Sequence, residues 1–117
     1  MFIFRNQKLR NAALECKIRI SSYLMKAEIV RFKIGKTADP IEKRYKETEE
    51  YKKDYDEIIS IYETVDKALV DSLEKKLIRD YMMTYPTKCK NKQKGSGPDC
   101  VDSENDIARI YIVVKYK

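Results

Sequence analysis

Residues 66–81 carry the strongest helical pattern in the chain, and this pattern constrains the fold most. Its apolar side chains recur at every fourth position and so share one face of a helix; they are Leu69, Leu73, Leu77 and Tyr81. The helix is predicted to end before Pro86. A chain of 117 residues has room for one two-layer core but not for a second domain. We therefore expect a single domain over residues 1–117.

Four segments carry strand patterns. Polar and apolar side chains alternate over residues 17–24, which is typical of a half-buried strand, and residues 29–34 form a second β-like run. The connection between these two segments is short, so an antiparallel hairpin is predicted. A third strand is predicted over residues 58–62, and enrichment in valine and tyrosine predicts a terminal strand over residues 107–116.

Two further helices are predicted. Residues 5–15 have a helix-forming composition and follow a short strand at residues 2–4. Asp39 and Pro40 predict a helix over residues 40–51, because aspartate can cap the first-turn amides and proline fits the first helical position. The predicted fold class is α+β, a small three-stranded antiparallel sheet flanked by helices. Its core has the order β-β-α-β-α, followed by an extra C-terminal strand.

Basic residues outnumber acidic residues by 25 to 19, which gives a net charge of +6. This balance favours a polyanionic partner such as nucleic acid, although a solvated surface that leans positive has the same composition. The chain has no run of the roughly 20 apolar residues that cross a membrane. Its N-terminus also lacks the basic-then-apolar order of a secretory signal, so we expect an intracellular protein.

Missing residue types restrict the chemistry. The chain has no histidine, which excludes Ser-His-Asp and Cys-His nucleophilic sites and zinc sites that need imidazole. Its three cysteines form no close pair and do not indicate a disulfide framework. The tripeptide Gly35-Lys36-Thr37 suggests a phosphate-binding P-loop, but that motif needs a glycine where this chain has Val30. Catalysis would depend on carboxylate, tyrosine, lysine and arginine side chains and on a hard metal ion.

A small set of polar residues has an unusual layout along the predicted elements; the set is Tyr23, Lys36, Arg44, Glu74 and Asn91. Arg44 lies early in its predicted helix, so its guanidinium could reach back over the sheet. Glu74 lies between Leu73 and Leu77 of the helical stripe and therefore borders the buried face. Taken singly, each residue is also what an ordinary helix surface or sheet edge carries.

Residues 32–44 resemble the second motif of the GIY-YIG nuclease superfamily together with its helix arginine. They are especially similar to the divergent phage and viral branch, in which the tripeptide is KIG, here Lys33-Ile34-Gly35. Ser21-Ser22-Tyr23 falls where the GIY tripeptide belongs. Downstream, residues 73–77 resemble the helix with the metal-binding glutamate, and residues 86–91 resemble the proline-then-asparagine segment. The resemblance covers about residues 17–91.

The resemblance implies a phosphodiester hydrolase that cuts DNA with one divalent ion, Mg²⁺ (or Mn²⁺). Glu74 would hold the ion, and Arg44 would clamp a phosphate oxygen. Tyr23 would take or orient the proton of the attacking water, with Lys36 nearby to favour removal of that proton. Asn91 would help to fix the geometry of the site.

The motifs also depart from the pattern of the family. Ser21 and Ser22 replace the first two residues of GIY, and Lys33 replaces the tyrosine of the second motif, so Tyr23 is the one motif tyrosine left. The alternative function is therefore a catalytically inactive nucleic-acid-binding module on the same fold. A charged interaction domain outside this family is a third hypothesis.

Lysines alternate with small or polar residues in the predicted loop over residues 86–98. One interpretation is a binding surface that contacts phosphates without reading sequence. The other interpretation is a solvated, mobile loop that binds nothing. The predicted nucleic-acid contacts are Lys33, Lys36, Arg44, Lys88, Lys90, Lys92 and Lys94. A domain of this size has little surface for specificity, so a homodimer or a structured substrate is expected to supply it. DNA is the expected substrate, and RNA is the other polyanion that fits the charge.

Overall fold

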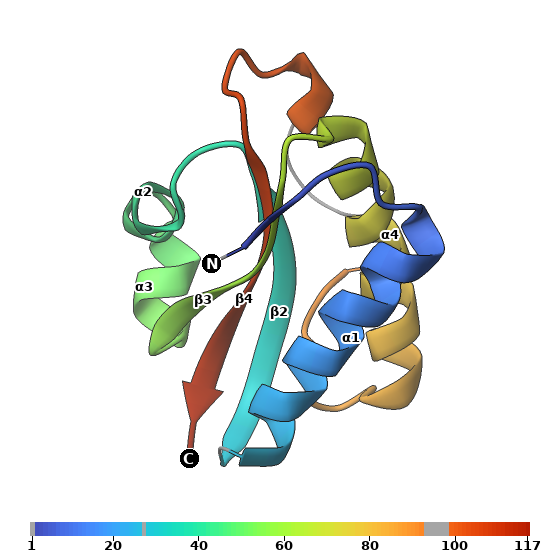
Figure 1. The fold of residues 1–117 in the computed structure, drawn as a ribbon. Coiled ribbons are helices and arrows are strands. Elements are labelled where there is room, and N and C mark those ends of the chain that lie inside the picture. Colours follow the sequence, from blue (N-terminus) through green and yellow to red (C-terminus); the bar gives the residue numbers. More distant parts are fainter. Residues whose placement is uncertain (1, 27, 93–98) are drawn as a thin grey trace.

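A four-stranded mixed sheet lies at the centre of the computed structural model, with helices on both of its faces (Figure 1). The structure describes residues 2–26, 28–92 and 99–117. Its elements in chain order are β1 (Ile3–Phe4), α1 (Leu9–Lys26), β2 (Ile29–Thr37), α2 (Ile41–Glu47), α3 (Glu49–Asp54), β3 (Glu57–Thr64), α4 (Lys67–Thr84), a 3₁₀ helix (Cys100–Asp102) and β4 (Ala108–Tyr116). The fold class is α+β, as predicted.

The last strand of the chain, β4, lies in the interior of the sheet. The strand order is β1-β3-β4-β2, and β4 runs antiparallel to both of its neighbours, whereas β1 pairs parallel with β3. Helices cover both faces of the sheet, and every side chain over residues 110–114 of β4 is buried. A strand covered on both faces is apolar at consecutive positions rather than at alternate positions, and β4 has this pattern.

Residues 17–24 lie in helix α1, so the strand predicted there and its hairpin with residues 29–34 are wrong. The buried side chains of α1 recur at helical spacing; they are Ala12, Ala13, Cys16 and Ile20. Most residues of this buried face are small and give only a weak helical pattern. The alternation of polar and apolar residues around Ile18 therefore dominated the sequence pattern, although Ile18 itself is exposed. β2 pairs with β4 instead, and Ile34 lies opposite Ile112. The three antiparallel strands are thus β3, β4 and β2.

Helix α4 confirms the helix predicted over residues 66–81 and extends it to Thr84. Asp66 caps this helix, because its carboxylate accepts a hydrogen bond from the Leu69 N–H at 3.1 Å. The apolar stripe of α4 packs with α1 against one face of the sheet and forms the larger core. No described helix, α4 included, is long and apolar enough to span a membrane.

The helix predicted over residues 40–51 is divided into α2 and α3 at Thr48. The backbone of Thr48 is extended, and its hydroxyl donates to the carbonyl oxygen of Arg44 at 2.7 Å. Pro40 precedes the first residue of α2 and no side chain caps this helix, so the capping role predicted for Asp39 is wrong. Together α2 and α3 cover the second face of the sheet, where Tyr51 packs on β4.

After α4 the chain runs beside the outer edge of β2. The Phe32 N–H donates to the Lys88 carbonyl oxygen, and the Lys90 N–H donates to the Phe32 carbonyl oxygen, both at 2.9 Å. The first part of the predicted loop over residues 86–98 is therefore held against the sheet. Its later part, with Lys94, lies outside the described residues.

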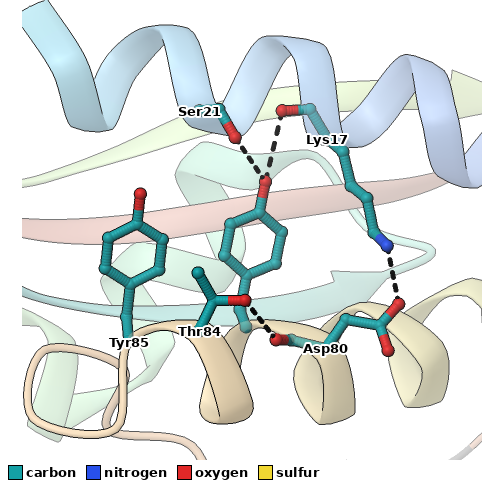
Figure 2. Close-up of a pocket in the computed structure, with 6 residues that line it drawn as sticks. Lys17, Ser21, Asp80, Thr84 and Tyr85 are labelled. Carbon is teal, nitrogen blue, oxygen red and sulfur yellow. Dashed lines mark hydrogen bonds and ion pairs between the residues drawn. The ribbon is translucent and has the colours of Figure 1, made fainter.

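A polar contact joins α1 to α4 (Figure 2). Lys17 Nζ lies 2.7 Å from Asp80 Oδ2, and the Tyr81 hydroxyl donates to the Lys17 carbonyl oxygen at 3.2 Å. The Ser21 hydroxyl lies 2.9 Å from the Tyr81 hydroxyl. These residues and Tyr85 border a hollow of about 160 Å³, and none of the predicted site residues that the structure describes lines it. The contact holds α4 against α1 and so helps to set the position of α4 over β2.

Asp80→Asn is expected to lower the free energy of unfolding at pH 7 by about 1 kcal/mol, as for a partly exposed ion pair of good geometry. Burial alone would raise the pKa of Asp80, but Lys17, Arg79 and Lys76 outweigh burial and hold that pKa below its usual value. A carboxylate with a lowered folded-state pKa stabilises the fold above its unfolded-state pKa, and this contribution is lost as the pH falls through the folded-state pKa. The free energies of unfolding of the two proteins, measured by urea denaturation, should therefore converge as the pH falls through the lowered folded-state pKa of Asp80. A matched control is Asp102→Asn, which removes a carboxylate that has no ion pair within the described residues. A stability difference for Asp80→Asn that persisted in acid would contradict the prediction.

Candidate active site

Four charged side chains meet where β2 passes α4. Lys36 Nζ lies 3.0 Å from Asp71 Oδ1, 3.1 Å from Asp99 Oδ1 and 3.8 Å from Glu74 Oε1. Asp71 and Glu74 are about one turn apart on α4, while Lys36 extends from the face of β2 on which α4 packs. We call Lys36, Asp71, Glu74 and Asp99 the Lys36 cluster. The structure thus brings together two of the predicted site residues, Lys36 and Glu74.

The Lys36 cluster has an excess of negative charge. Three carboxylates surround one ammonium group, and of these carboxylates Asp99 is the exposed one. Burial raises the pKa of Glu74 to about 7, although the charge of Lys36 opposes this rise. Glu74 is only 2% exposed, and its Oε1 has no hydrogen-bond partner among the described residues. The cluster therefore contains a buried carboxylate oxygen that can accept one more positive partner.

Asp71 is a member of this cluster that the sequence analysis missed. Its carboxylate accepts hydrogen bonds from the backbone N–H groups of Cys100 at 2.8 Å and Val101 at 3.2 Å. Burial alone would raise the pKa of Asp71, but these hydrogen bonds and the bond from Lys36 lower it. Asp71 therefore attaches the segment after the lysine-rich loop to α4. Its position three residues before Glu74 was the available signal, since residues i and i+3 lie on one side of a helix.

Lys36 is held as a cation inside the cluster. Burial alone would lower its pKa, but hydrogen bonds to Asp71 and Asp99 outweigh burial and raise it. Its side chain is only 4% exposed. The ammonium group therefore faces carboxylates rather than solvent, which does not favour the direct nucleic-acid contact predicted for Lys36.

Arg44 lies on the other face of the sheet, on α2. Its Nε donates to the Tyr111 hydroxyl at 3.1 Å, and the Tyr111 and Tyr51 hydroxyls are hydrogen-bonded at 2.7 Å. No carboxylate among the described residues forms an ion pair with Arg44. Arg44 nevertheless lies close enough to act on Glu74. Burial raises the pKa of Glu74, and the positive charges of Lys36 and, to a smaller extent, Arg44 oppose this rise. Half-buried and without a carboxylate partner, the guanidinium is available to an anion.

Gly35 makes room for Tyr111 beside Arg44. The two residues are paired across β2 and β4, and a Cβ added at Gly35 would lie 2.3 Å from Tyr111 Cζ. This contact gives a physical reason for the glycine of the KIG tripeptide. Sequence analysis missed Tyr111 and Tyr51, because Tyr111 lies in an apolar run typical of a buried strand. No local pattern connects it to Arg44, which is 67 positions away.

Asn91 pairs with the outer edge of β2. Its Oδ1 accepts a hydrogen bond from the Ile34 N–H and its Nδ2 donates to the Ile34 carbonyl oxygen, both at 2.7 Å. The side-chain amide thus satisfies backbone groups that would otherwise need a neighbouring strand. It fixes the strand that carries Lys36. A role of Asn91 in the geometry of a catalytic site stays a prediction.

Tyr23 lies apart from the other predicted site residues. It is on α1, 41% exposed, and it borders a hollow with Phe2, Ile18 and Lys26. Within the described part of the chain, none of the other predicted site residues lines this hollow. Residues 17–24 are helical, so Tyr23 is not on a strand beside β2, where the resemblance placed it.

Lys88 and Lys90, two of the lysines predicted to bind nucleic acid, lie along the outer edge of β2, and Lys33 lies on this strand. Lys88, Lys90 and Lys92 are exposed, and the first two flank Cys89, which bridges to Phe32. Lys33 Nζ lies 3.0 Å from Glu50 Oε1. Lys94 lies outside the described residues.

The carboxylate oxygens of the Lys36 cluster could supply part of the coordination shell of a hard divalent ion. In residues 2–26, 28–92 and 99–117, no group of three or more cysteine, aspartate or glutamate side chains could hold a metal by itself. The observation that fits an ion is the Oε1 of the buried Glu74, which has no hydrogen-bond partner among the described residues and lies within an excess of negative charge. Mg²⁺ is commonly held by one or two carboxylates, with waters and substrate phosphates completing its shell. The cluster therefore suits an ion whose coordination the substrate completes.

The comparison with known families covers most of the chain. Residues 17–104 match the T5orf172 domain. The match ends before β4, although this strand is interior to the sheet. No curated protein and no solved structure matches the chain. The chain belongs to the T5orf172 domain family, a phage-derived domain found in nuclease-associated proteins of the GIY-YIG and HNH-like kinds.

Proposed function

We propose that this chain is a metal-dependent endonuclease that hydrolyses phosphodiester bonds in DNA through a GIY-YIG-type site. The observation that carries the proposal is the Lys36 cluster, where the Oε1 of the buried Glu74 has no hydrogen-bond partner among the described residues. Membership of the T5orf172 family supports a nuclease-related or DNA-binding module. The resemblance of residues 32–44 to the second GIY-YIG motif supports the nuclease in particular.

In this proposal Glu74 holds Mg²⁺ (or Mn²⁺). When bound, the ion stabilises the negative charge that grows on the scissile phosphate and on the leaving oxygen. Lys36 and Asp71 keep the Glu74 carboxylate in place, and Lys36 offsets part of the negative charge of the cluster. Arg44 binds a phosphate oxygen through its planar donors, since no carboxylate among the described residues neutralises it. The place of Tyr23 on α1 does not support a role in proton transfer, and the proposal does not depend on one.

The lysines beside β2 supply the surface that binds the DNA backbone. Lys88 and Lys90 flank the point where the chain pairs with Phe32, so their spacing follows the extended backbone. Contacts of this kind bind phosphates without reading sequence. We therefore expect affinity for DNA of any sequence, with a strong dependence on salt.

The double substitution Lys88→Ala and Lys90→Ala is expected to weaken DNA binding and to make it less dependent on salt. Each phosphate neutralised contributes about 0.9 to the slope of log K against log [salt], so the slope should fall by about 2. Fluorescence anisotropy in EDTA at several salt concentrations measures this slope. Lys26→Ala is the matched control, because Lys26 is an exposed lysine at the end of α1. Equal slopes for all three proteins would show that the edge of β2 does not contact phosphates.

Cleavage by the native chain is the test of the proposed function. Supercoiled plasmid, single-stranded DNA and branched DNA would each be incubated with Mg²⁺, Mn²⁺ or EDTA. Nicking that requires the metal supports the proposal. No cleavage of any substrate, with DNA binding that weakens steeply as salt rises, would overturn it and favour the inactive nucleic-acid-binding module. Absence of DNA binding would overturn both functions.

A further inference from the structure

Two buried tyrosines form the immediate surroundings of Arg44. Tyr111 is fully buried on the interior strand β4, and Tyr51 is 5% exposed on α3. The two hydroxyls are hydrogen-bonded to each other, and the Tyr111 hydroxyl also accepts the hydrogen bond from Arg44 Nε. The Arg44 guanidinium carbon lies 6.0 Å from the centroid of the Tyr51 ring. Arg44 is thus held by two aromatic side chains from two different elements.

We propose that Tyr111 and Tyr51 are positioning residues that hold the Arg44 guanidinium in the orientation in which it binds a DNA phosphate. This inference rests on the proposed function. Nothing local to α2 fixes the long side chain of Arg44, which would otherwise sample many rotamers. The hydrogen bond at Nε fixes the plane of the guanidinium, so the remaining donors of Arg44 point in a defined direction.

The surroundings of Tyr111 explain why it can hold Arg44 rigidly. Its ring occupies the space that Gly35 leaves open on β2. On the other side it packs edge-to-face with Tyr51, with ring centroids 5.9 Å apart. A side chain held on both sides loses little further entropy when it orients a neighbour. The strand pairing of Gly35 with Tyr111 therefore places the hydroxyl within reach of α2.

Tyr111 is suited to positioning rather than to proton transfer. Its side chain is 0% exposed, so its hydroxyl does not face the solvent from which an attacking water would come. Burial, and after it the neighbouring Tyr51, raises the pKa of Tyr111 far above its usual value, which keeps the phenol neutral. A neutral phenol can accept the hydrogen bond from Arg44 and donate to Tyr51, and so complete the chain of hydrogen bonds.

The experiment compares Tyr111→Phe with Tyr45→Phe in single-turnover cleavage with Mg²⁺. Tyr111→Phe keeps the ring over Gly35 and removes only the hydroxyl that contacts Arg44. Tyr45→Phe removes one hydrogen bond from the same aromatic cluster, the bond to the Tyr55 carbonyl oxygen, and so controls for lost stability. The cleavage rate of Tyr111→Phe is expected to fall about 10-fold to 100-fold, since small misplacements of a substrate clamp have effects of that size. Tyr45→Phe should stay within about twofold of the native rate, an effect below the smallest expected from misplacing a clamp.

A double-mutant cycle separates positioning from a general structural effect. In the Arg44→Ala background, Tyr111→Phe should cause no further loss of rate, because it acts through the guanidinium that is already absent. The slope of DNA affinity against salt should fall by about 1 for Arg44→Ala and stay unchanged for Tyr111→Phe, which keeps the charge. Equal losses in the two backgrounds, or native cleavage by Tyr111→Phe, would overturn the inference.

The same variants distinguish failure of this inference from failure of the proposed function. If the native chain does not cut DNA, the endonuclease proposal fails, and the cycle is then measured on DNA affinity in EDTA. A loss of affinity in Tyr111→Phe that disappears in the Arg44→Ala background would still support positioning of Arg44 for phosphate binding. Affinity equal to that of the native chain would overturn it.

Discussion

Glu74→Gln is expected to reduce metal-dependent DNA cleavage by about 10²–10³-fold, the usual effect of removing one preorganised electrostatic contact to a transition state. The amide keeps the shape of the side chain but removes the charge that would hold a divalent ion. The loss should be specific to activity. Burial already raises the pKa of Glu74 to about 7, so a neutral group is tolerated at this position. We therefore expect the thermal midpoint of Glu74→Gln to equal or exceed that of the native chain.

Single-turnover cleavage with Mg²⁺ and with Mn²⁺ measures this effect, and the binding of Mn²⁺ to the free protein provides a second readout. Glu28→Gln is the control, because Glu28 is exposed and has no ion pair with another described side chain. Native cleavage by a folded Glu74→Gln protein would rule out Glu74 as the residue that holds the ion. Loss of cleavage without loss of Mn²⁺ binding would place the ion elsewhere.

Gly35→Ala is expected to destabilise the fold by about 3 kcal/mol, near the upper end of the usual cost of overpacking a core. The new Cβ would lie 2.3 Å from Tyr111 Cζ and 2.4 Å from the Tyr111 hydroxyl oxygen, which is far inside van der Waals contact. The ring cannot move away easily, since Tyr111 is fully buried and hydrogen-bonded to Tyr51 and Arg44. Urea denaturation followed by circular dichroism measures the change in the free energy of unfolding.

A second background isolates the cause of this loss. All three atoms nearest to the added Cβ belong to the distal part of the Tyr111 side chain, which leucine lacks. In a Tyr111→Leu protein, Gly35→Ala should therefore cost less than about 1 kcal/mol, because the two positions are in contact and their effects are not additive. An equal cost in both backgrounds would show that the strand itself requires glycine there, whatever lies opposite.

Two long segments show how far the sequence predicted the fold. The helix α4 was predicted correctly, because its apolar residues are large and recur at helical spacing over four turns. The strand predicted over residues 17–24 is helix α1, because the buried face of α1 consists mainly of small residues. Alanine and cysteine contribute little to an apolar pattern, although they let a helix pack closely on α4. An exposed isoleucine at position 18 then produced a false alternation.

The candidate site was predicted in part. Two of the predicted site residues, Lys36 and Glu74, lie together, and Asn91 reaches β2, while the roles given to them stay predictions. Tyr23 does not join them, because the strand beside β2 is β4 rather than residues 17–24. The tyrosine whose hydroxyl accepts the hydrogen bond from Arg44 Nε is Tyr111, from a distant part of the chain. Pairing between distant strands depends on how complete faces become buried, and no local spacing encodes it.

The sequence by itself determined the local elements and the chemistry available to them. Periodicity placed Glu74 beside the apolar stripe of α4, and the absence of histidine limited the site to carboxylates, lysine, arginine and tyrosine. Only the tertiary structure decided which residues meet. It put the C-terminal strand between β2 and β3 and brought the Tyr111 ring over Gly35. It also left the Glu74 Oε1 without a hydrogen-bond partner among the described residues. The physical reason is that hydrogen-bond geometry sets helices and strands over a few residues, whereas burial of the sheet faces selects the strand order across the whole chain.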